Sequence, residues 1–303
     1  MKKSSVIGID LGGTYIKIGQ FLENGLCINF STIETPRPAT PEAVVTAITQ
    51  IVKVLKKDCD SIALGVGIPG PVDCTNRISK IAINLSNWKN VSLADLLEKH
   101  TQLPTVIEND ANCAGLGEAW LGAGKIYKNL IMLTLGTGVG GAIILDDQLF
   151  TGHLGTAGEL GLITLDFNGP ICKSGNRGSL EQFGSIQAIR RMTGKDPAEL
   201  GSLAKEGHKE AILFWEKYGQ LLGAGLANII YILTPEAIVI GGGISGSMPF
   251  FLEATLKEIE QRVLPTSRTN LKLLEAKLGN KAGMLGAAKL AWNLVNNISN
   301  KFN

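Results

Sequence analysis

The stretch IGIDLGGTYIKIG, residues 7–19, decides the fold because it places a tight glycine turn between two apolar runs. Val6–Asp10 is a short apolar run that ends in an acid, and Tyr15–Phe21 is a second strand candidate. The turn between them consists of Gly12, Gly13 and Thr14. This pattern predicts a β-hairpin whose exposed backbone N–H groups can bind phosphate oxygens. Asp10 at the strand end can orient Mg²⁺ through water, although a plain hairpin turn containing an aspartate is the alternative.

A similar arrangement occurs in the second half of the chain, where LGTGVGG, residues 135–141, separates two apolar runs. The predicted turn contains Gly136, Thr137 and Gly138. It is no dinucleotide fingerprint, because it leads into a strand instead of opening a helix, and the chain contains no P-loop motif. We interpret it as a second phosphate-binding hairpin from a distant internal duplication, with an ordinary glycine-rich strand turn as the alternative.

Composition and the order of elements indicate a globular α/β protein. The chain has 303 residues, of which 45% are hydrophobic and 18% charged, so it can bury a sizeable core. Apolar strand candidates, such as 61–68 and 105–108, alternate with helical patterns, such as the one after Thr40-Pro41. This alternation predicts an α/β fold.

Charge and cysteine content exclude several classes of function. The net charge is +2 with no long basic run, so we expect no nucleic-acid partner. The longest apolar stretch, residues 221–233, is too short to span a membrane, and we expect no signal peptide. The five cysteines never show C-x-x-C spacing and predict reduced thiols in a cytoplasmic protein.

Candidate residues for chemistry lie at strand ends and in an irregular stretch. Phosphoryl transfer needs a base that accepts the hydroxyl proton, and Asp110 is the candidate, with Asn109 able to hold a neighbouring hydroxyl. From these residues alone, a helix N-cap is the more frequent role for Asp110. Glu159 and Glu181 suit the recognition of a polyol, although exposed loop acids are the simpler interpretation.

A run of three glycines follows the strand candidate at residues 237–240. These glycines are Gly241, Gly242 and Gly243. Backbone without side chains can lie flat against a nucleoside, but a tight strand–helix turn is an equally good interpretation.

Taken together and in this order, several stretches resemble the ROK family of sugar kinases and sugar-responsive repressors, within the hexokinase and actin-like ATPase superfamily. The matching stretches are IGIDLGGTYIKIG, GVGIPGPVD, INLSNWKNVSL, IENDANCAGLGEAWLGAG, LTLGTGVGGAII, GTAGELG, GPICKSGNRGSLE, PEAIVIGGGIS and AGMLGAAKLA. The resemblance implies two actin-like (ribonuclease H-like) α/β domains with an active-site cleft between them. We expect domains at residues 1–118 plus 287–303 and at residues 119–286.

The resemblance also implies roles for individual residues. It makes Asp110 the catalytic base and Asp10 the residue that holds Mg²⁺ through water. The implied sugar-binding residues are Asn84, Asn109, Glu159 and Glu181. The implied nucleotide-binding residues are Asp10, Gly12, Gly13, Thr14, Lys17, Gly136, Thr137, Gly138, Gly241, Gly242 and Gly243.

The implied activity is ATP-dependent phosphorylation of the 6-hydroxyl of a hexose, with glucose as the expected substrate. N-acetylhexosamine, fructose and mannose remain open as substrates, polyphosphate remains open as a donor, and we expect a homodimer. A repressor needs a helix-turn-helix domain, and we expect none because five residues precede the first strand. A catalytically weak sugar sensor is the alternative from another class.

One departure from the family pattern concerns a structural zinc ion, which a histidine and three cysteines usually hold. The corresponding positions here are Leu162, Cys172, Ser174 and Ser179. Leucine and neutral serine cannot replace imidazole and thiolate around Zn²⁺, so we expect no zinc at this site.

Overall fold

The computed structural model describes residues 4–57, 59–75, 77–82 and 85–300. The chain divides into two compact units. The first contains residues up to 125, 148–157 and from 280 onward, and the second contains residues 126–147 and 158–279. The domain boundaries expected at 118/119 and 286/287 stay a prediction. Within the described residues, no helix combines the length and the apolar character needed to cross a bilayer.

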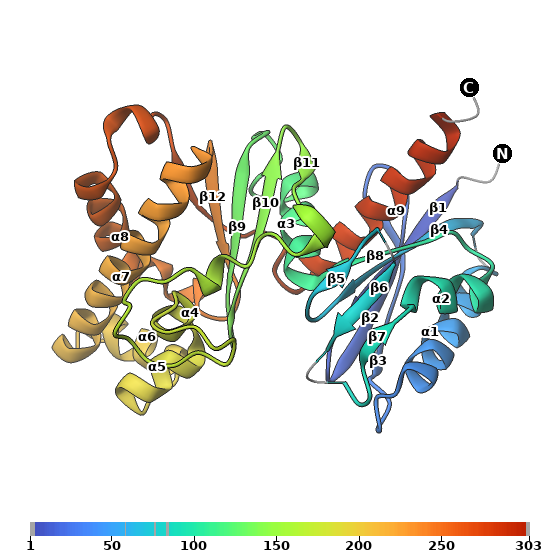
Figure 1. Ribbon diagram of the computed structural model, residues 1–303, viewed down its shortest axis with the longest axis horizontal. Coiled ribbons are helices and arrows are strands. Elements are labelled where there is room, and N and C mark those ends of the chain that lie inside the picture. The colour runs from blue at the N-terminus through green and yellow to red at the C-terminus, as the bar shows by residue number, and fades with distance from the viewer. Residues whose placement is uncertain (1–3, 58, 76, 83–84, 301–303) are drawn as a thin grey trace. The chain divides into compact units, whose positions relative to one another are not determined.

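The first unit is built on a five-stranded sheet of order β3-β2-β1-β4-β8 (Figure 1). Its strands are β1 (Ser5–Leu11), β2 (Tyr15–Phe21), β3 (Cys27–Glu34), β4 (Ser61–Ile68) and β8 (Thr105–Asn109). β1 pairs antiparallel with β2 and parallel with β4, so the first predicted hairpin is confirmed. A small separate sheet consists of β5 (Val72–Asp73), β6 (Ile78–Ile81) and β7 (Lys89–Val91).

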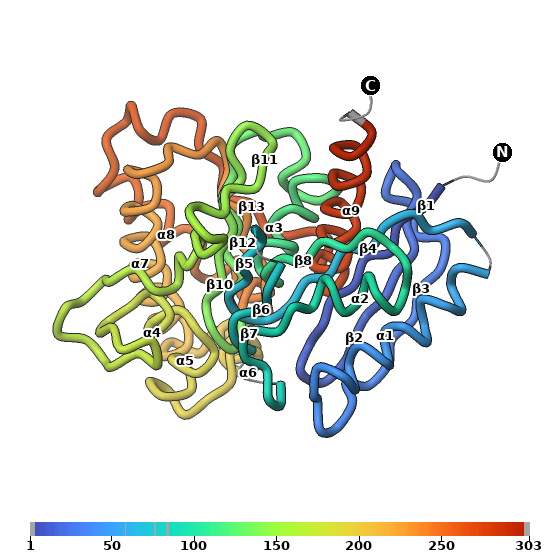
Figure 2. Tube along the Cα trace, turned by 45° about the vertical axis from the view of Figure 1, so that its right-hand side comes forward, coloured from blue at the N-terminus to red at the C-terminus, as the bar shows by residue number. Residues whose placement is uncertain are grey.

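Helices pack against both faces of this sheet (Figures 1 and 2). They are α1 (Pro41–Leu55), α2 (Leu93–Thr101), α3 (Asp110–Leu121) and α9 (Ala282–Asn300). Successive residues of a strand face opposite sides, so Ile7 and Ile9 join the core with α1 and α2 while Gly8 faces α9. A Cβ atom on Gly8 would lie 2.2 Å from the carbonyl oxygen of Met284, so glycine is needed for α9 to pack this closely.

A second sheet of the same design has the order β11-β10-β9-β12-β13, and all of its strands except the short edge strand β11 belong to the second unit. Its strands are β9 (Leu130–Leu135), β10 (Val139–Leu145), β11 (Gln148–Leu149), β12 (Ala237–Gly241) and β13 (Lys272–Glu275). β9 pairs antiparallel with β10 and parallel with β12, as β1 does with β2 and β4. The second predicted hairpin is therefore confirmed, and the shared strand order is what an internal duplication predicts.

The core of the second unit lies between this sheet and its long helices. The helices are α4 (Glu181–Gly184), α5 (Ile186–Thr193), α6 (Pro197–Lys205), α7 (Lys209–Leu233) and α8 (Met248–Arg262). Short 3₁₀ helices occur at His153–Gly155, Leu160–Leu162, Ser245–Ser247, Pro265–Ser267 and Gly279–Lys281. Trp215 of α7 stacks 5.7 Å from Phe251 of α8, measured between ring centroids, and both side chains are fully buried. Burying an aromatic side chain contributes about 1.5–3 kcal/mol, so this contact joins the two helices firmly.

Candidate functional site

Two hydrogen bonds, one within the backbone and one from a side chain, hold the glycine turn between β1 and β2. Gly12 N donates to Tyr15 O at 3.0 Å, and the Thr35 hydroxyl donates to Gly12 O at 2.7 Å. Gly13 and Thr14 are exposed at the tip of the turn. The turn is thus fixed from behind, while its tip presents backbone to solvent, as a phosphate-binding loop requires.

Asp10 and Lys17 are opposite each other across this hairpin. Lys17 Nζ lies 3.3 Å from Asp10 Oδ2 and also donates to Asn280 O at 3.3 Å. A Cβ atom on Gly283, near the start of α9, would lie 3.3 Å from the Asp10 carboxyl carbon. Asp10 therefore lies at the carboxyl end of β1 with one side against α9 and with its side chain still 22% exposed.

Asp110 is the first residue of α3 and directly follows β8. The N-cap is Asn109, whose Oδ1 accepts from the backbone N–H groups of Ala111 and Asn112 at 2.9 and 3.1 Å. The N-cap interpretation of Asp110 is therefore wrong, because the helix begins one residue earlier than that role requires. The carboxylate of Asp110 stays at the helix N-terminus, where the helix dipole favours a negative charge.

The amide of Asn109 is mostly committed to the fold. Its Oδ1 caps α3, and its Nδ2 donates to Gly70 O at 3.1 Å. A side-chain amide has two N–H donors, and one of those of Asn109 binds Gly70 O within the described residues. The other N–H can donate to a ligand hydroxyl. The predicted sugar contact of Asn109 is compatible with this geometry and stays a prediction.

Asp10 and Asp110 lie at the same edge of the first sheet, one near the end of β1 and the other directly after β8. Their strands, β1 and β8, flank β4 in parallel, so all three carboxyl ends meet at one edge of the sheet. Burial raises the pKa of the Cys113 thiol. The negative charges of Glu108, Asp110 and Asp10 raise this pKa further, so both aspartates lie near the same thiol. Ligands of α/β sheets bind outside this edge, which places the two predicted acids where a ligand would lie.

A buried carboxylate behind Asp110 had no predicted role. Glu108 Oε1 accepts from Asn109 N at 2.8 Å and from Asn112 Nδ2 at 3.0 Å, and its Oε2 accepts from the Cys74 thiol at 2.9 Å. Burial raises the pKa of Glu108, and these hydrogen bonds oppose that effect only in part. Burial and the neighbouring Glu108 likewise raise the pKa of Cys74. The position of Glu108 in an apolar strand was the available signal that this acid is buried. Its partner Cys74 is distant in sequence, so the contact between them could not be predicted.

An acid from another element, Glu181 of α4, lies at the turn of the second hairpin. Gly136 N donates to Gly138 O at 2.9 Å, closing the turn between β9 and β10. Glu181 Oε2 accepts from Val139 N at 3.0 Å, and a Cβ atom on Gly138 would lie 2.5 Å from the same oxygen. Gly138 therefore makes room for the carboxylate of Glu181, while Thr137 is exposed between the two glycines.

Glu159 and Glu181 come together although 21 residues separate them in the chain. Glu159 precedes the 3₁₀ helix Leu160–Leu162, and Glu181 begins α4. Burial raises the pKa of Glu159, and the nearby charge of Glu181 raises it further. Both acids lie against β10, because Glu181 accepts from Val139 N and a Cβ atom on Gly161, two residues after Glu159, would lie 2.0 Å from Val139 O. Two acids on one strand suit the recognition of a polyol.

The three glycines at the end of β12 lie at the base of the second hairpin. Gly242 has φ +90°, and a Cβ atom there would lie 2.3 Å from Leu135 O at the end of β9. Ile244 N also donates to Leu135 O at 3.1 Å. Gly242 and Gly243 are exposed, whereas Gly241 is the buried last residue of β12. The structure therefore brings this glycine run next to the second predicted phosphate turn.

Only one of the four positions of the family zinc site has a side chain that commonly binds zinc. Cys172 is a buried free thiol. Burial raises its pKa, but the hydroxyl and backbone of the nearby Ser174 outweigh that effect and lower it. The Leu162 side chain offers no donor atom, and one thiol with two neutral hydroxyls does not fit tetrahedral Zn²⁺. Within the described residues, no three His, Cys, Asp or Glu side chains gather as a metal site.

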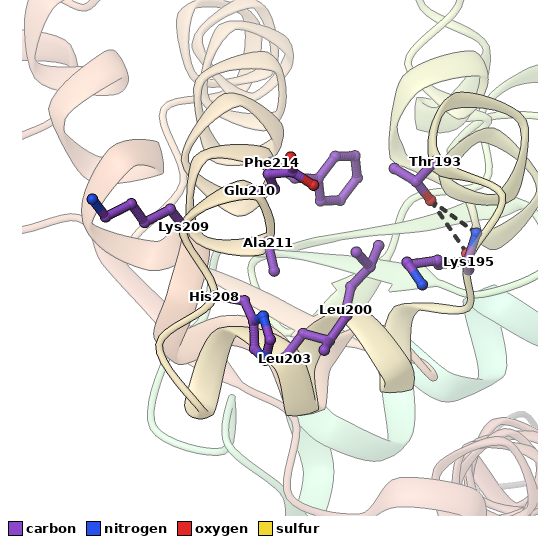
Figure 3. Close-up of a pocket in the computed structure, with 9 residues that line it drawn as sticks. All are labelled: Thr193, Lys195, Leu200, Leu203, His208, Lys209, Glu210, Ala211 and Phe214. Carbon is purple, nitrogen blue, oxygen red and sulfur yellow. Dashed lines mark hydrogen bonds between the residues drawn. The ribbon is translucent and has the colours of Figure 1, made fainter.

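Asn84, predicted to bind sugar, lies outside the described residues. A cavity of about 360 Å³ in the second unit contains none of the predicted site residues (Figure 3). Leu200, Leu203 and Phe214 line its apolar part, and the ammonium of Lys195 at its rim pairs with Glu199. This cavity is separate from the residues assigned to sugar and nucleotide.

Comparison with known proteins gives consistent matches over nearly the whole chain. A family model described as ROK family matches residues 6–293. The chain is 32% identical over 310 residues to a glucokinase from Thermotoga maritima, a match that covers 96% of this chain and 98% of the relative.

Solved structures match as well. The ROK hexokinase from Thermus thermophilus gives a TM-score of 0.86 at 30% identity and covers 97% of this chain and 99% of that one. A ROK family glucokinase from Streptomyces griseus, in complex with glucose and AMPPNP, gives 0.79 at 32% identity and covers 95% and 99%. These matches confirm the expected fold class, an α/β fold of two actin-like domains.

Proposed function

The chain belongs to the ROK family, and on that premise we propose that it is an ATP-dependent hexose kinase that phosphorylates the 6-hydroxyl of a hexose. Glucose is the first candidate substrate, because the similar proteins from Thermotoga maritima and Streptomyces griseus are glucokinases. Mannose, fructose and N-acetylhexosamines are the other candidates. The observation that carries the proposal is the pair of glycine hairpins of the same design, one in each unit, together with Asp10 and Asp110 at the same edge of the first sheet.

Each hairpin has a phosphate-binding role in this proposal. The turn with Gly12, Gly13 and Thr14 and the turn with Gly136, Thr137 and Gly138 present backbone N–H groups to the phosphates of ATP. Gly241, Gly242 and Gly243 leave room for the nucleoside. Hydrogen bonds behind each turn, from the Thr35 hydroxyl in the first and to Gly138 O in the second, keep the backbone preorganised.

Asp110 is the proposed catalytic base. Its carboxylate accepts the proton of the attacking hydroxyl as the oxygen approaches the terminal phosphorus of ATP. Glu159 and Glu181 each accept hydrogen bonds from sugar hydroxyls, and Asn109 donates one, which together orient the hexose. Asn84 belongs to the same proposed set.

Asp10 is the residue that would hold Mg²⁺. A single carboxylate that keeps part of its surface exposed suits this ion, which retains most of its water ligands. When bound, Mg²⁺ supplies positive charge that neutralises the phosphate oxygens during transfer. Lys17, 3.3 Å from Asp10, orients the carboxylate and adds a second positive charge near the phosphates. A cytoplasmic location and a homodimer are part of the same proposal.

A sugar sensor with little catalytic activity is the second candidate. It is favoured by the altered residues at Leu162, Ser174 and Ser179, because the family histidine at the first of these positions contacts the sugar. Saturable hexose binding without turnover of any hexose would support the sensor and contradict the kinase.

The test is a coupled assay with ATP, Mg²⁺ and a panel of hexoses, repeated with polyphosphate as donor, on the wild type and on Asp110→Asn. We expect the variant to lose about 10²–10⁴-fold in kcat, because asparagine cannot accept the proton. Calorimetry should show that glucose binding is retained within a few fold. The matched control is Asp147→Asn, the same change at an exposed turn between β10 and β11. Wild-type turnover by Asp110→Asn would contradict the assigned base.

A further inference from the structure

We propose that Asn176 is a positioning residue that ties together the two arms of the segment between Glu159 and Glu181 and so holds these acids at a fixed separation. Residues 160–180 form this segment, the linking loop. The inference deepens the proposed function and rests on it, because the proposal assigns both acids to the sugar. Asn176 belongs to none of the predicted binding sets.

The two arms of the linking loop pair with each other beside the acids. Leu180 N donates to Ile163 O at 2.9 Å, within a short antiparallel pairing. Ile163 lies four residues after Glu159, and Leu180 immediately precedes Glu181. The pairing of the arms therefore determines how far apart the two carboxylates lie.

Asn176 connects these arms through its side chain, and its backbone closes a turn within the second arm. Its Nδ2 donates to Leu162 O at 2.8 Å and to the Thr164 hydroxyl at 3.1 Å, both on the first arm. Its Oδ1 accepts from Arg177 N at 2.7 Å, which fixes the orientation of the amide. Its carbonyl oxygen accepts from Cys172 N at 2.7 Å on the second arm. With the bond from its backbone N–H to the Ser174 hydroxyl at 3.4 Å, one residue thus makes hydrogen bonds to five positions of the loop.

Apolar burial holds the middle of the linking loop only in part. Cys172 is buried and Leu165 packs against the core, but Phe167 and Ile171 are 79% and 64% exposed. The positions that correspond to the family zinc site do not fit the ion either. Hydrogen bonds therefore add an essential share of the interactions that order this part of the loop against its conformational entropy.

The two acids are anchored to the second hairpin in different ways. Glu181 accepts a hydrogen bond from Val139 N at 3.0 Å, whereas Glu159 is held through its neighbours, since a Cβ atom on Gly161 would lie 2.0 Å from Val139 O. Asn176 binds the carbonyl oxygen of Leu162, the residue after Gly161, so we expect the loss of this bond to loosen the contact and shift Glu159 relative to Glu181. A binding site with two carboxylates needs both within about 0.5 Å of their working positions, so this movement weakens binding of the sugar and leaves ATP binding unchanged.

Three variants and one control test this role. Asn176→Ala removes all hydrogen bonds of the side chain. Asn176→Asp retains an acceptor for Arg177 N and for the Thr164 hydroxyl but loses both donor contacts. Thr164→Val removes one partner only. The control is Asn168→Ala, the same change at an exposed position of the same loop.

Two readouts separate the outcomes. We expect the KM for the hexose to rise about tenfold in Asn176→Ala, less in the other two variants, with the KM for ATP unchanged and wild-type values for the control. Hydrogen exchange of the Leu180 amide should accelerate in the same order. Unchanged hexose KM in both Asn176 variants, with or without faster exchange, overturns the inference. A wild type without kinase activity instead overturns the proposed function. Calorimetry of hexose binding then tests the role of Asn176. That role is overturned if the variants bind hexose with unchanged affinity, or if the wild type binds no hexose.

Discussion

Replacing Glu108 tests the buried cluster behind the proposed base. In Glu108→Ala, Asn109 N and Asn112 Nδ2 lose their acceptor, as does the weaker Cys74 thiol donor. Asn112 is buried, and its Oδ1 has no partner within the described residues, so its amide would be left entirely unpaired. Each unsatisfied buried N–H costs about 1–3 kcal/mol, and the thiol adds less, so we expect a loss of about 3–5 kcal/mol in the free energy of unfolding.

Chemical denaturation followed by circular dichroism measures this loss. The control is Glu34→Ala, which removes an exposed acid of β3 and should stay within about 0.5 kcal/mol of the wild type. A loss below about 1 kcal/mol in Glu108→Ala would refute the reasoning, because it would show that the three donors find other partners at no cost.

The same carboxyl gives a pH dependence of known sign. Burial raises the pKa of Glu108 above its ordinary value of 4.5, so the folded protein binds this proton more tightly than the unfolded chain does. The contribution of Glu108 to stability is therefore largest at low pH and falls as the pH rises from about 4.5 through the raised value. Glu108→Gln does not titrate, so the wild type should lose stability relative to it over this range. A difference that stays flat or grows with pH would contradict the assigned pKa direction.

Two further predictions concern packing and metal. Gly286→Ala should lower the free energy of unfolding by about 3 kcal/mol or more, because its Cβ atom would lie 1.7 Å from Cys113 O where α9 meets α3. Gly246→Ala, with no atom within 4 Å of its Cβ, is the control, and equal melting temperatures for both would argue against this close contact. Incubation with a zinc chelator should leave the melting temperature of the wild type unchanged, because Leu162, Ser174 and Ser179 offer no zinc ligands. Bound zinc in the purified protein, or a melting temperature lowered by the chelator, would contradict this expectation.

Much of the fold is readable in the sequence because its signals are local. Alternating apolar residues, a glycine turn and an acid at a strand end all lie within residues 7–19, and the same signals recur around Gly136. Both hairpins form as predicted, and both sheets continue in the same strand order. Period-two alternation also sets which side of β1 carries Asp10, since Gly8 and Asp10 face α9 together.

Other features depended on residues that only the tertiary structure brings together. Asn109, not Asp110, caps α3, and a shift of one residue at a helix start is beyond what residue preference resolves. Glu108 meets Cys74 across 34 positions of sequence, and no local pattern connects them.

The sequence by itself determined the α/β class and the two glycine hairpins, because short-range sterics and hydrophobic alternation encode them. Only the tertiary structure decided that Glu159 and Glu181 are neighbours and that Asn176 ties the loop between them. The linking loop has no hydrophobic periodicity to predict its path, and its conformation depends on a few hydrogen bonds between distant residues.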